Sequence, residues 1–254
     1  MQFEVKSETR KNREVAIVTM DLLPPNNTLN LDMMLEFTKI MEDLGKTADA
    51  IIVESKNSKF FSNGLDGSFL LSCNLEQRKE TILEMTKFYG KLWMIPKPWM
   101  VKIEGFAMAG GAVISGAADY RFMLEGGGRI GFSEPLVGLL IPRAYLAGIE
   151  SFVQPASVRP IMEGRAYKAK EALEIQLVDE VAPDSESLQK AIYRKIDTIF
   201  RLPGNTFLTT RMGYREHIYK KIEAGMKEDL EIIPGLIESP DFEVALNMIA
   251  GKNR

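Results

Sequence analysis

The sequence predicts an α/β fold, and three observations support this prediction. Several short apolar runs have the length and composition of buried strands, at 15–20, 50–54 and 99–103. The last of these runs passes through small residues, from Gly105 to Ala112, into an apolar helix-like run at 113–118. After Pro142 the pattern is helical almost to the end of the chain, apart from a short segment at 177–181.

Two helices are predicted before the central strand. The first runs from Asn30, a good N-cap, to about Gly45, with its apolar residues near one face. The second covers about 75–92, and residues 67–74 are expected to form a loop that leads into it.

A strand is predicted at 119–123, after the apolar run. Asp119 at its start is expected to cap or to pair with a basic residue rather than to catalyse. The glycine-rich segment 125–129 lacks the G-K-[ST] ending of a phosphate-binding loop and lies between two strands, so a turn is predicted there.

Composition narrows the classes of function. The chain has 254 residues, 45% hydrophobic and 26% charged, which fits one large domain or a domain with a small appendage. A net charge of −3 argues against a nucleic-acid-binding surface. The densest basic group alternates with glutamates and is predicted to be a solvated helix face; it comprises Arg211, Arg215, Lys220, Lys221 and Lys227.

Cysteine and histidine are each present once. Cys73 alone excludes an intrachain disulfide and suits a reducing compartment. His217 lies in a charged helical stretch, so neither a Ser-His-Asp arrangement nor a histidine-rich metal site is predicted. Residues 1–12 have no apolar signal-peptide core, no membrane-spanning run is found, and the last residues are not a peroxisomal signal. A cytoplasmic protein is expected.

The stretch 99–138 contains the candidate site. A strand, a glycine-rich turn and a helix leave free backbone N–H groups at the helix start, where the helix dipole favours negative charge. A phosphate, or a carbonyl oxygen that becomes negative during a reaction, could bind there. Downstream, Glu134 stands among Phe132, Pro135 and Leu136. Apolar surroundings should raise its pKa, as a proton-transferring group at neutral pH requires.

Two motifs of this sequence resemble those of the crotonase (enoyl-CoA hydratase/isomerase) superfamily, and they occur in the family's order. The family's pattern is G-x-A-x-G-G, an apolar helix, an Asp, and an acid followed by an apolar-apolar-Gly step. Its counterparts here are Gly105–Gly111, which reads G-F-A-M-A-G-G with one additional residue, then Asp119 and Glu134–Gly138. An upstream F-S-x-G-x-D motif stands at residues 61–66. Gln176 departs from the family pattern, in which a glycine usually precedes the L-V-D step.

The resemblance implies a spiral of ββα units (1–182) and a C-terminal helical trimerisation region (183–254), assembled as a homotrimer or a dimer of trimers. It also implies an acyl-CoA thioester substrate, with no cofactor beyond the coenzyme A of the substrate. The backbone N–H groups of Leu65 and Gly110 would form the oxyanion hole, with Glu134 as the catalytic residue. The substrate or its coenzyme A would contact Lys59, Phe61, Asp66, Gly111 and Val113. Lys59 would meet the phosphates, although a solvated lysine is the alternative.

The acids present suggest which reaction is catalysed. Family members that hydrate enoyl-CoA use two acids, and the position of the first is occupied here by Val113. The hydratase stretch I-P-G-A-G-G is also changed, to I-P-R-A-Y-L at 141–146. An arrangement with Glu134 as the single acid resembles that of the Δ3,Δ2-enoyl-CoA isomerases. In these enzymes one base moves a proton from C2 to C4, and water is excluded.

Alternatives stay open from the sequence. A hydratase, or another crotonase reaction such as decarboxylation, requires a second carboxylate in the cleft, from Asp66, Glu104 or Glu125. A non-catalytic acyl-CoA-binding subunit is a further possibility, because fold does not fix function. Glu134 could instead be a structural acid paired with Arg143 or Arg129, which would lower its pKa.

Overall fold

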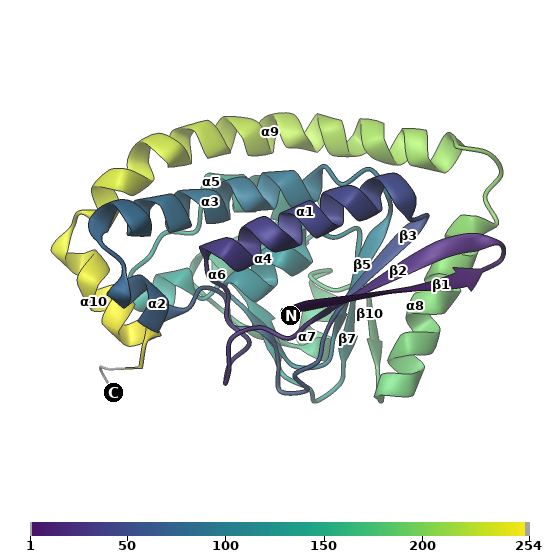
Figure 1. Cartoon of the computed structure of the whole chain (residues 1–254), viewed down its shortest axis with the longest axis horizontal. Helices are drawn as coiled ribbons and strands as arrows, with labels where there is room; N and C mark the ends of the chain where they lie inside the picture. The colour runs from purple at the N-terminus through teal and green to yellow at the C-terminus, as the bar shows by residue number, and fades with distance from the viewer. Residues whose placement is uncertain (1, 252–254) are drawn as a thin grey trace.

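A computed structural model describes residues 2–251 (Figure 1), and its main sheet has the strand order β1-β2-β3-β5-β7-β10. Its strands are β1 (Phe3–Arg10), β2 (Arg13–Met20), β3 (Ala50–Ser55), β5 (Trp99–Ile103), β7 (Tyr120–Leu124) and β10 (Glu180–Ala182). Only the β1–β2 hairpin is antiparallel among the pairs of this sheet. The strands predicted from apolar runs are therefore confirmed as neighbours in one sheet.

A second, smaller sheet has the order β4-β6-β8-β9, formed by β4 (Phe60–Ser62), β6 (Phe106–Met108), β8 (Arg129–Gly131) and β9 (Tyr167–Lys168). Strands β3, β5 and β7 of the main sheet are each followed by a strand of the second sheet and then by helix. This repetition confirms the predicted spiral of ββα units. The turn predicted at 125–129 joins β7 to β8.

The helices lie mainly on one side of the main sheet (Figure 1). They are α1 (Leu31–Thr47), α2 (Gly67–Ser72), α3 (Leu75–Trp93), α4 (Gly110–Ala117), α5 (Arg143–Ile149), α6 (Val158–Met162), α7 (Ala169–Glu174), α8 (Ser185–Phe200), α9 (Thr206–Ile237) and α10 (Pro240–Ile249), with 3-10 turns η1 (Glu134–Val137) and η2 (Pro155–Ser157). Helix α9 runs along α3 and α5, whereas α8 covers the opposite face of the sheet.

Local signals explain where these elements begin. The Asn30 side chain accepts a hydrogen bond from the Met33 N–H, as predicted, and this bond caps α1. Residues 67–74 were predicted to be a loop, and this prediction was wrong because α2 forms there. The Asp66 side chain caps α2 by accepting from the Phe69 N–H at 2.6 Å. Gln176 adopts a φ of 63°, a left-handed conformation that explains why glycine is usual at this position in the family.

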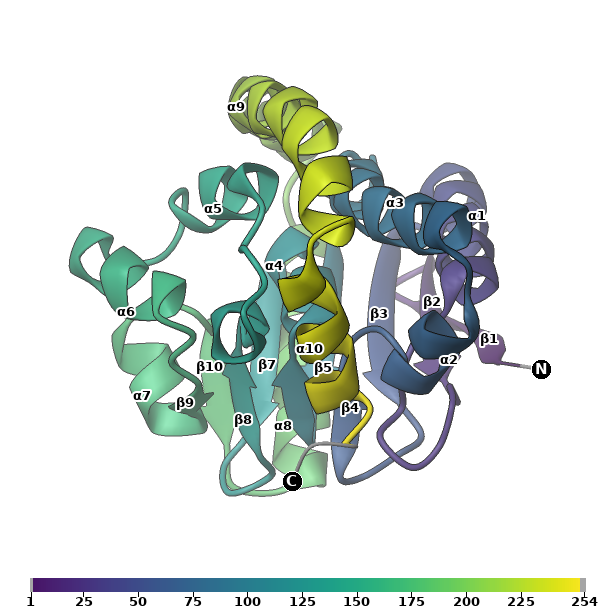
Figure 2. The ribbon, with the colours of Figure 1, turned by 90° about the vertical axis from the view of Figure 1, so that its left-hand side faces the viewer.

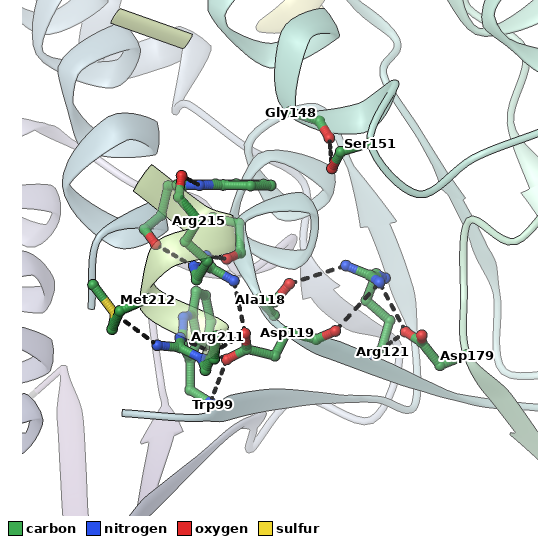
Figure 3. A network of polar contacts seen from close by, with 12 residues as sticks. Trp99, Ala118, Asp119, Arg121, Gly148, Ser151, Asp179, Arg211, Met212 and Arg215 are labelled. Carbon is green, nitrogen blue, oxygen red and sulfur yellow. Dashed lines mark hydrogen bonds and ion pairs between the residues drawn. The ribbon is translucent and has the colours of Figure 1, made fainter. Parts of the chain in front are cut away.

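A buried ionic cluster fixes α9 to the sheet (Figure 3). Asp119 accepts hydrogen bonds from Arg211 and Arg215 of α9, with N···O distances of 2.8 Å, and from the Trp99 N–H at 2.9 Å. The structural role predicted for Asp119 is thus confirmed. The prediction that the basic group is solvated was wrong for Arg211 and Arg215, which are buried because this carboxylate lies beneath α9. Lys220, Lys221 and Lys227 are exposed.

The C-terminal helices pack on the rest of this chain. Helix α8 packs an apolar face onto the main sheet, and α10 packs against α2 and η1 (Figure 2). The division at residue 182, between β10 and α8, and the trimer both stay predictions. Within residues 2–251, no helix is long and apolar enough to cross a bilayer.

Candidate active site

A cavity of about 690 Å³ opens where the ends of several elements meet. Its wall is formed by the loop before α2, by α3, by the start of α4, by residues 133–142 and by α10. Leu70, Ile82, Leu140, Phe242 and Leu246 make much of this wall apolar. The cavity therefore suits a ligand with a hydrocarbon portion.

The turn at Gly64 directs one backbone N–H away from the neighbouring strand. The Leu29 N–H donates to the Gly64 carbonyl at 2.8 Å, and the Asp66 N–H donates to the Leu29 carbonyl at 2.9 Å. Leu65 lies between these two bonds and lines the cavity. In the part of the chain that the structure describes, its N–H has no hydrogen-bond acceptor. A ligand oxygen could accept from this N–H.

The first turn of α4 brings a second free N–H to the same place. Gly110 is the first residue of α4, so its N–H has no acceptor within the helix. A Cβ atom on Gly64, whose φ is 85°, would lie 2.7 Å from the Gly110 nitrogen. The two backbone segments are in contact only because neither residue has a side chain. Leu65 and Gly110 thus present two N–H donors on one wall of the cavity, which is the arrangement of an oxyanion hole.

Glu134 begins η1 and lines the same cavity. The residue as a whole is half-buried, but its Oε2 atom is buried and has no hydrogen-bond partner among the described residues. Burial raises the pKa of Glu134 from its usual 4.5 to about 7, and a hydrogen bond from its own backbone N–H opposes this effect only in part. At neutral pH this carboxyl can therefore both accept and donate a proton.

Neither arginine considered as a partner approaches the Glu134 carboxyl within 4 Å. Arg143 instead pairs with Asp229 at 3.2 Å and with Glu228 at 3.1 Å, and Arg129 donates to the Ala166 carbonyl. Among residues 2–251, Glu134 forms no ion pair. The pairing that would make it a purely structural acid is therefore absent from this part of the chain.

The other carboxylates considered for a second acid lie outside the cavity wall. Glu104 pairs with Lys102 at 3.3 Å, and Glu125 pairs with Lys170. Asp66 uses both oxygens structurally, since it caps α2 and accepts from the Thr28 hydroxyl at 2.8 Å. Within residues 2–251, no group of three or more His, Cys, Asp or Glu side chains is placed to hold a metal ion.

The remaining predicted site residues do not line the cavity. Phe61 and Val113 are fully buried in the core, and Gly111 lets α4 approach β4, because a Cβ there would lie 2.2 Å from the Ser62 carbonyl oxygen. Lys59 is exposed on the β3–β4 connection, with its ammonium over the Phe60 ring. The structure thus brings together Leu65, Gly110 and Glu134, and their roles stay predictions.

Two features of the site were not predicted from the sequence. Tyr145 of α5 lines the cavity beside Glu134, and the only signal was that it replaces a glycine of the hydratase stretch. The apolar face of α10 covers the cavity of its own chain, whereas the resemblance suggested packing on neighbouring subunits. Amphipathic spacing identifies such a face but not the surface that it covers.

A family profile and several known proteins match this chain. The family profile for enoyl-CoA hydratase/isomerase matches residues 10–251. The chain belongs to this family. It is 28% identical over 247 residues to the mitochondrial enoyl-CoA delta isomerase 1 of Rattus norvegicus, covering 95% of this chain and 85% of that protein. It is 29% identical over 188 residues to the short-chain-enoyl-CoA hydratase of Clostridium acetobutylicum, covering 71% and 70%.

Solved structures confirm the fold of this family member. Human mitochondrial delta3-delta2-enoyl-CoA isomerase matches with a TM-score of 0.87 at 22% identity, covering 98% of this chain and 97% of that one. An enoyl-CoA hydratase from Bacillus halodurans matches with a TM-score of 0.83 at 17% identity, covering 96% and 99%. Because the relatives are named for both activities, the reaction has to be inferred from the site. The cytoplasmic location stays a prediction, since one relative is mitochondrial.

Proposed function

We propose that this protein moves the double bond of a 3-enoyl-CoA to the 2 position, with Glu134 as the only base. The observation that carries this proposal is the Glu134 carboxyl itself. Its Oε2 is buried in the cavity wall and has no hydrogen-bond partner among residues 2–251, and its pKa is raised to about 7. No second carboxylate accompanies it at the position of Val113, which is buried in the core.

The reaction follows from this arrangement. The thioester oxygen accepts hydrogen bonds from the N–H groups of Leu65 and Gly110. Glu134 takes a proton from C2, and the electrons of the C–H bond form a dienolate whose negative charge lies largely on the thioester oxygen. The protonated Glu134 then returns a proton to C4 while the C2–C3 double bond forms. Substrate and product contain the same atoms, so the reaction consumes no water. We propose no cofactor beyond the substrate's coenzyme A.

The rest of the substrate would occupy surfaces already described. The hydrocarbon chain would lie against the apolar wall formed by α2, α3 and α10. Lys59, which is exposed, would meet the coenzyme A phosphates. We further propose assembly as a homotrimer or a dimer of trimers, because exposed apolar side chains outside the cavity wall remain on α9 and α10, among them Ile232 and Val244. Sedimentation of the purified protein tests the assembly.

The test of the reaction uses 3-hexenoyl-CoA and the absorbance of the conjugated product. Glu134→Gln should reduce the rate by about 10³-fold, because loss of a general base commonly has this effect. The matched control is Glu150→Gln, which removes an exposed carboxyl outside the cavity wall and should leave the rate unchanged. Comparable rates for the wild-type protein and Glu134→Gln would refute the role of Glu134.

Two other results would identify the alternatives. If the wild-type protein incorporates solvent oxygen into a 2-enoyl-CoA and does not isomerise 3-hexenoyl-CoA, it is a hydratase that uses another carboxylate. If it binds acyl-CoA, catalyses neither reaction and does not exchange the C2 proton, it is a binding subunit.

A further inference from the structure

Tyr145 of α5 is held in one position beside the candidate base. It is 2% exposed and lines the cavity that also contains Glu134. Its hydroxyl donates to the Met85 carbonyl at 3.0 Å. Its ring lies against those of Tyr89 and Phe132, with centroid distances of 5.0 and 6.5 Å. Because both its hydroxyl and its ring have partners, the side chain has little freedom to move.

The hydrogen bond to Met85 links the two halves of the site. Met85 belongs to α3, and its terminal methyl lies over the start of α4, since a Cβ on Gly110 would be 2.5 Å from the Met85 Cε. Tyr145 thus connects the wall beside Glu134 to the wall beside the oxyanion hole. In the described part of the chain no polar group reaches the Glu134 Oε2. Tyr145 and Glu134 line the same cavity, and the charge of Glu134 contributes to the raised pKa of Tyr145. The Tyr145 ring fills space in this cavity wall that a glycine would leave open.

We propose that Tyr145 is the positioning residue that keeps water away from Glu134, so that the proton taken from the substrate returns to it and water does not add to the double bond. This inference rests on the proposed function and assigns its specificity to one side chain. A hydratase needs a water molecule beside its acid, and the hydratase stretch has glycine where this chain has Tyr145. Filling that space favours isomerisation over hydration.

The charged groups around the cavity agree with this role. Of the described residues that line it, only Glu134, Tyr145 and Asp241 are titratable, and Asp241 is exposed at the start of α10. Burial, and then the charge of Glu134, raise the pKa of Tyr145 well above its usual value, so its hydroxyl stays protonated. Among the described residues that line the cavity, no charged partner offsets the burial of Glu134, so its pKa depends on how well the cavity wall excludes water.

The first test follows protons in the wild-type protein. Isomerisation of 3-hexenoyl-CoA in D₂O adds one hydrogen to C4. In the wild-type protein this added hydrogen should be mostly protium, because the Glu134 proton is returned before it exchanges with solvent. Tyr145→Ala should raise deuterium at C4 several-fold and give detectable 3-hydroxyacyl-CoA, in which hydroxyl is added to C3 and a proton to C2. Tyr145→Phe, which keeps the ring, and Tyr214→Ala, at a 53% exposed tyrosine, should resemble the wild-type protein.

A second measurement needs no turnover. The infrared band of the protonated Glu134 carboxyl, assigned by its loss in Glu134→Gln, should titrate near pH 7 in the wild-type protein. In Tyr145→Ala its midpoint should fall toward 4.5, because water can then stabilise the carboxylate. If Tyr145→Ala does not fold, Tyr145→Leu replaces it in both tests.

The outcomes separate this inference from the proposed function. If the wild-type protein added deuterium to C4 in every turnover, the role of Tyr145 would be overturned, while the isomerase activity would stand. A folded Tyr145→Ala protein with unchanged deuteration and an unchanged infrared midpoint would also overturn it. If the wild-type protein does not isomerise the substrate, the proposed function fails, and the infrared midpoint alone decides whether Tyr145 excludes water.

Discussion

Asp119 and Glu134 are two buried carboxylates of the same chain in opposite surroundings. Asp119 lies under α9 and is held by Arg211, Arg215 and a backbone N–H (Figure 3). Burial alone would raise the pKa of Asp119, but the charges of the two arginines and the hydrogen bonds lower it below its usual value. Within the described part of the chain Glu134 has no cationic partner, and burial raises its pKa to about 7.

The difference shows that burial does not by itself decide what a carboxylate does. Desolvation acts in the same direction on both groups, and nearby cations reverse its effect only at Asp119. A buried carboxylate that is fully paired stabilises the fold and cannot readily exchange a proton. A buried carboxylate without partners costs stability, and it is suited to proton transfer near neutral pH.

Asp119→Asn should have the largest effect on stability. It leaves the guanidinium groups of Arg211 and Arg215 buried without a counter-charge, and breaking such a cluster typically costs about 3–5 kcal/mol. Urea unfolding followed by circular dichroism measures the loss. Asp43→Asn, which breaks exposed pairs with Lys39 and Lys46, is the control and should cost far less, because water screens exposed ion pairs. Equal losses in the two variants would mean that the buried cluster does not anchor α9.

Gly64→Ala should lower activity without touching either carboxylate. The new Cβ would lie 2.7 Å from the Gly110 nitrogen, so the two N–H donors must move apart. Loss of one such donor costs about 3 kcal/mol of transition-state stabilisation, which corresponds to at least about 10²-fold in rate. Gly126→Ala is the matched control, because Gly126 has a similar φ of 78° but no atom within 4 Å of the added Cβ. Similar rates for both variants would remove Gly64 from the site.

Stability should depend on pH with opposite sign at the two carboxylates. The folded pKa of Glu134 lies above its unfolded value of 4.5, so its contribution is most favourable below pH 4.5 and is lost as the pH rises to about 7. Glu134→Gln should therefore match the wild-type stability near pH 4 and exceed it at pH 8 by at most roughly 3 kcal/mol. For Asp119 the favourable contribution is present at neutral pH and is lost as the pH falls through its lowered pKa. If the free energies of unfolding of the wild-type protein and Glu134→Gln differed by the same amount at every pH from 4 to 8, the raised pKa would be contradicted.

Most of the fold could be predicted because its signals are local. Apolar runs identified three strands of the main sheet, a fourth was predicted at 119–123, and Asn30 identified the start of α1. The short helix α2 was not predicted, because its main local signal is the capping carboxylate of Asp66. Asp66 also belongs to the F-S-x-G-x-D motif, which does not by itself indicate a helix. The burial of Arg211 was missed because its partner, Asp119, lies 92 residues away in the sequence.

The candidate site could be predicted only as far as its motifs extend. Leu65, Gly110 and Glu134 belong to motifs, and the structure places all three on one cavity. Tyr145 belongs to no motif, and its place on the cavity wall depends on how α5 packs against α3 and α4. The motifs also did not indicate that Val113 would be excluded from the cavity wall, because that depends on how α4 packs in the core.

The smallest expected effect concerns the arginines that do not pair with Glu134. Arg129→Gln and Arg143→Gln should leave the midpoint of the pH–rate profile near 7, where the rate rises as Glu134 becomes a carboxylate. Arg143→Gln should lower stability, because the fully buried Asp229 loses an ion-pair partner, but the midpoint does not depend on that pair. The pH dependence of kcat/KM with 3-hexenoyl-CoA measures it. A rise in the midpoint of either variant would show that the arginine had been lowering the pKa of Glu134, and the contrast with Asp119 would then be one of degree.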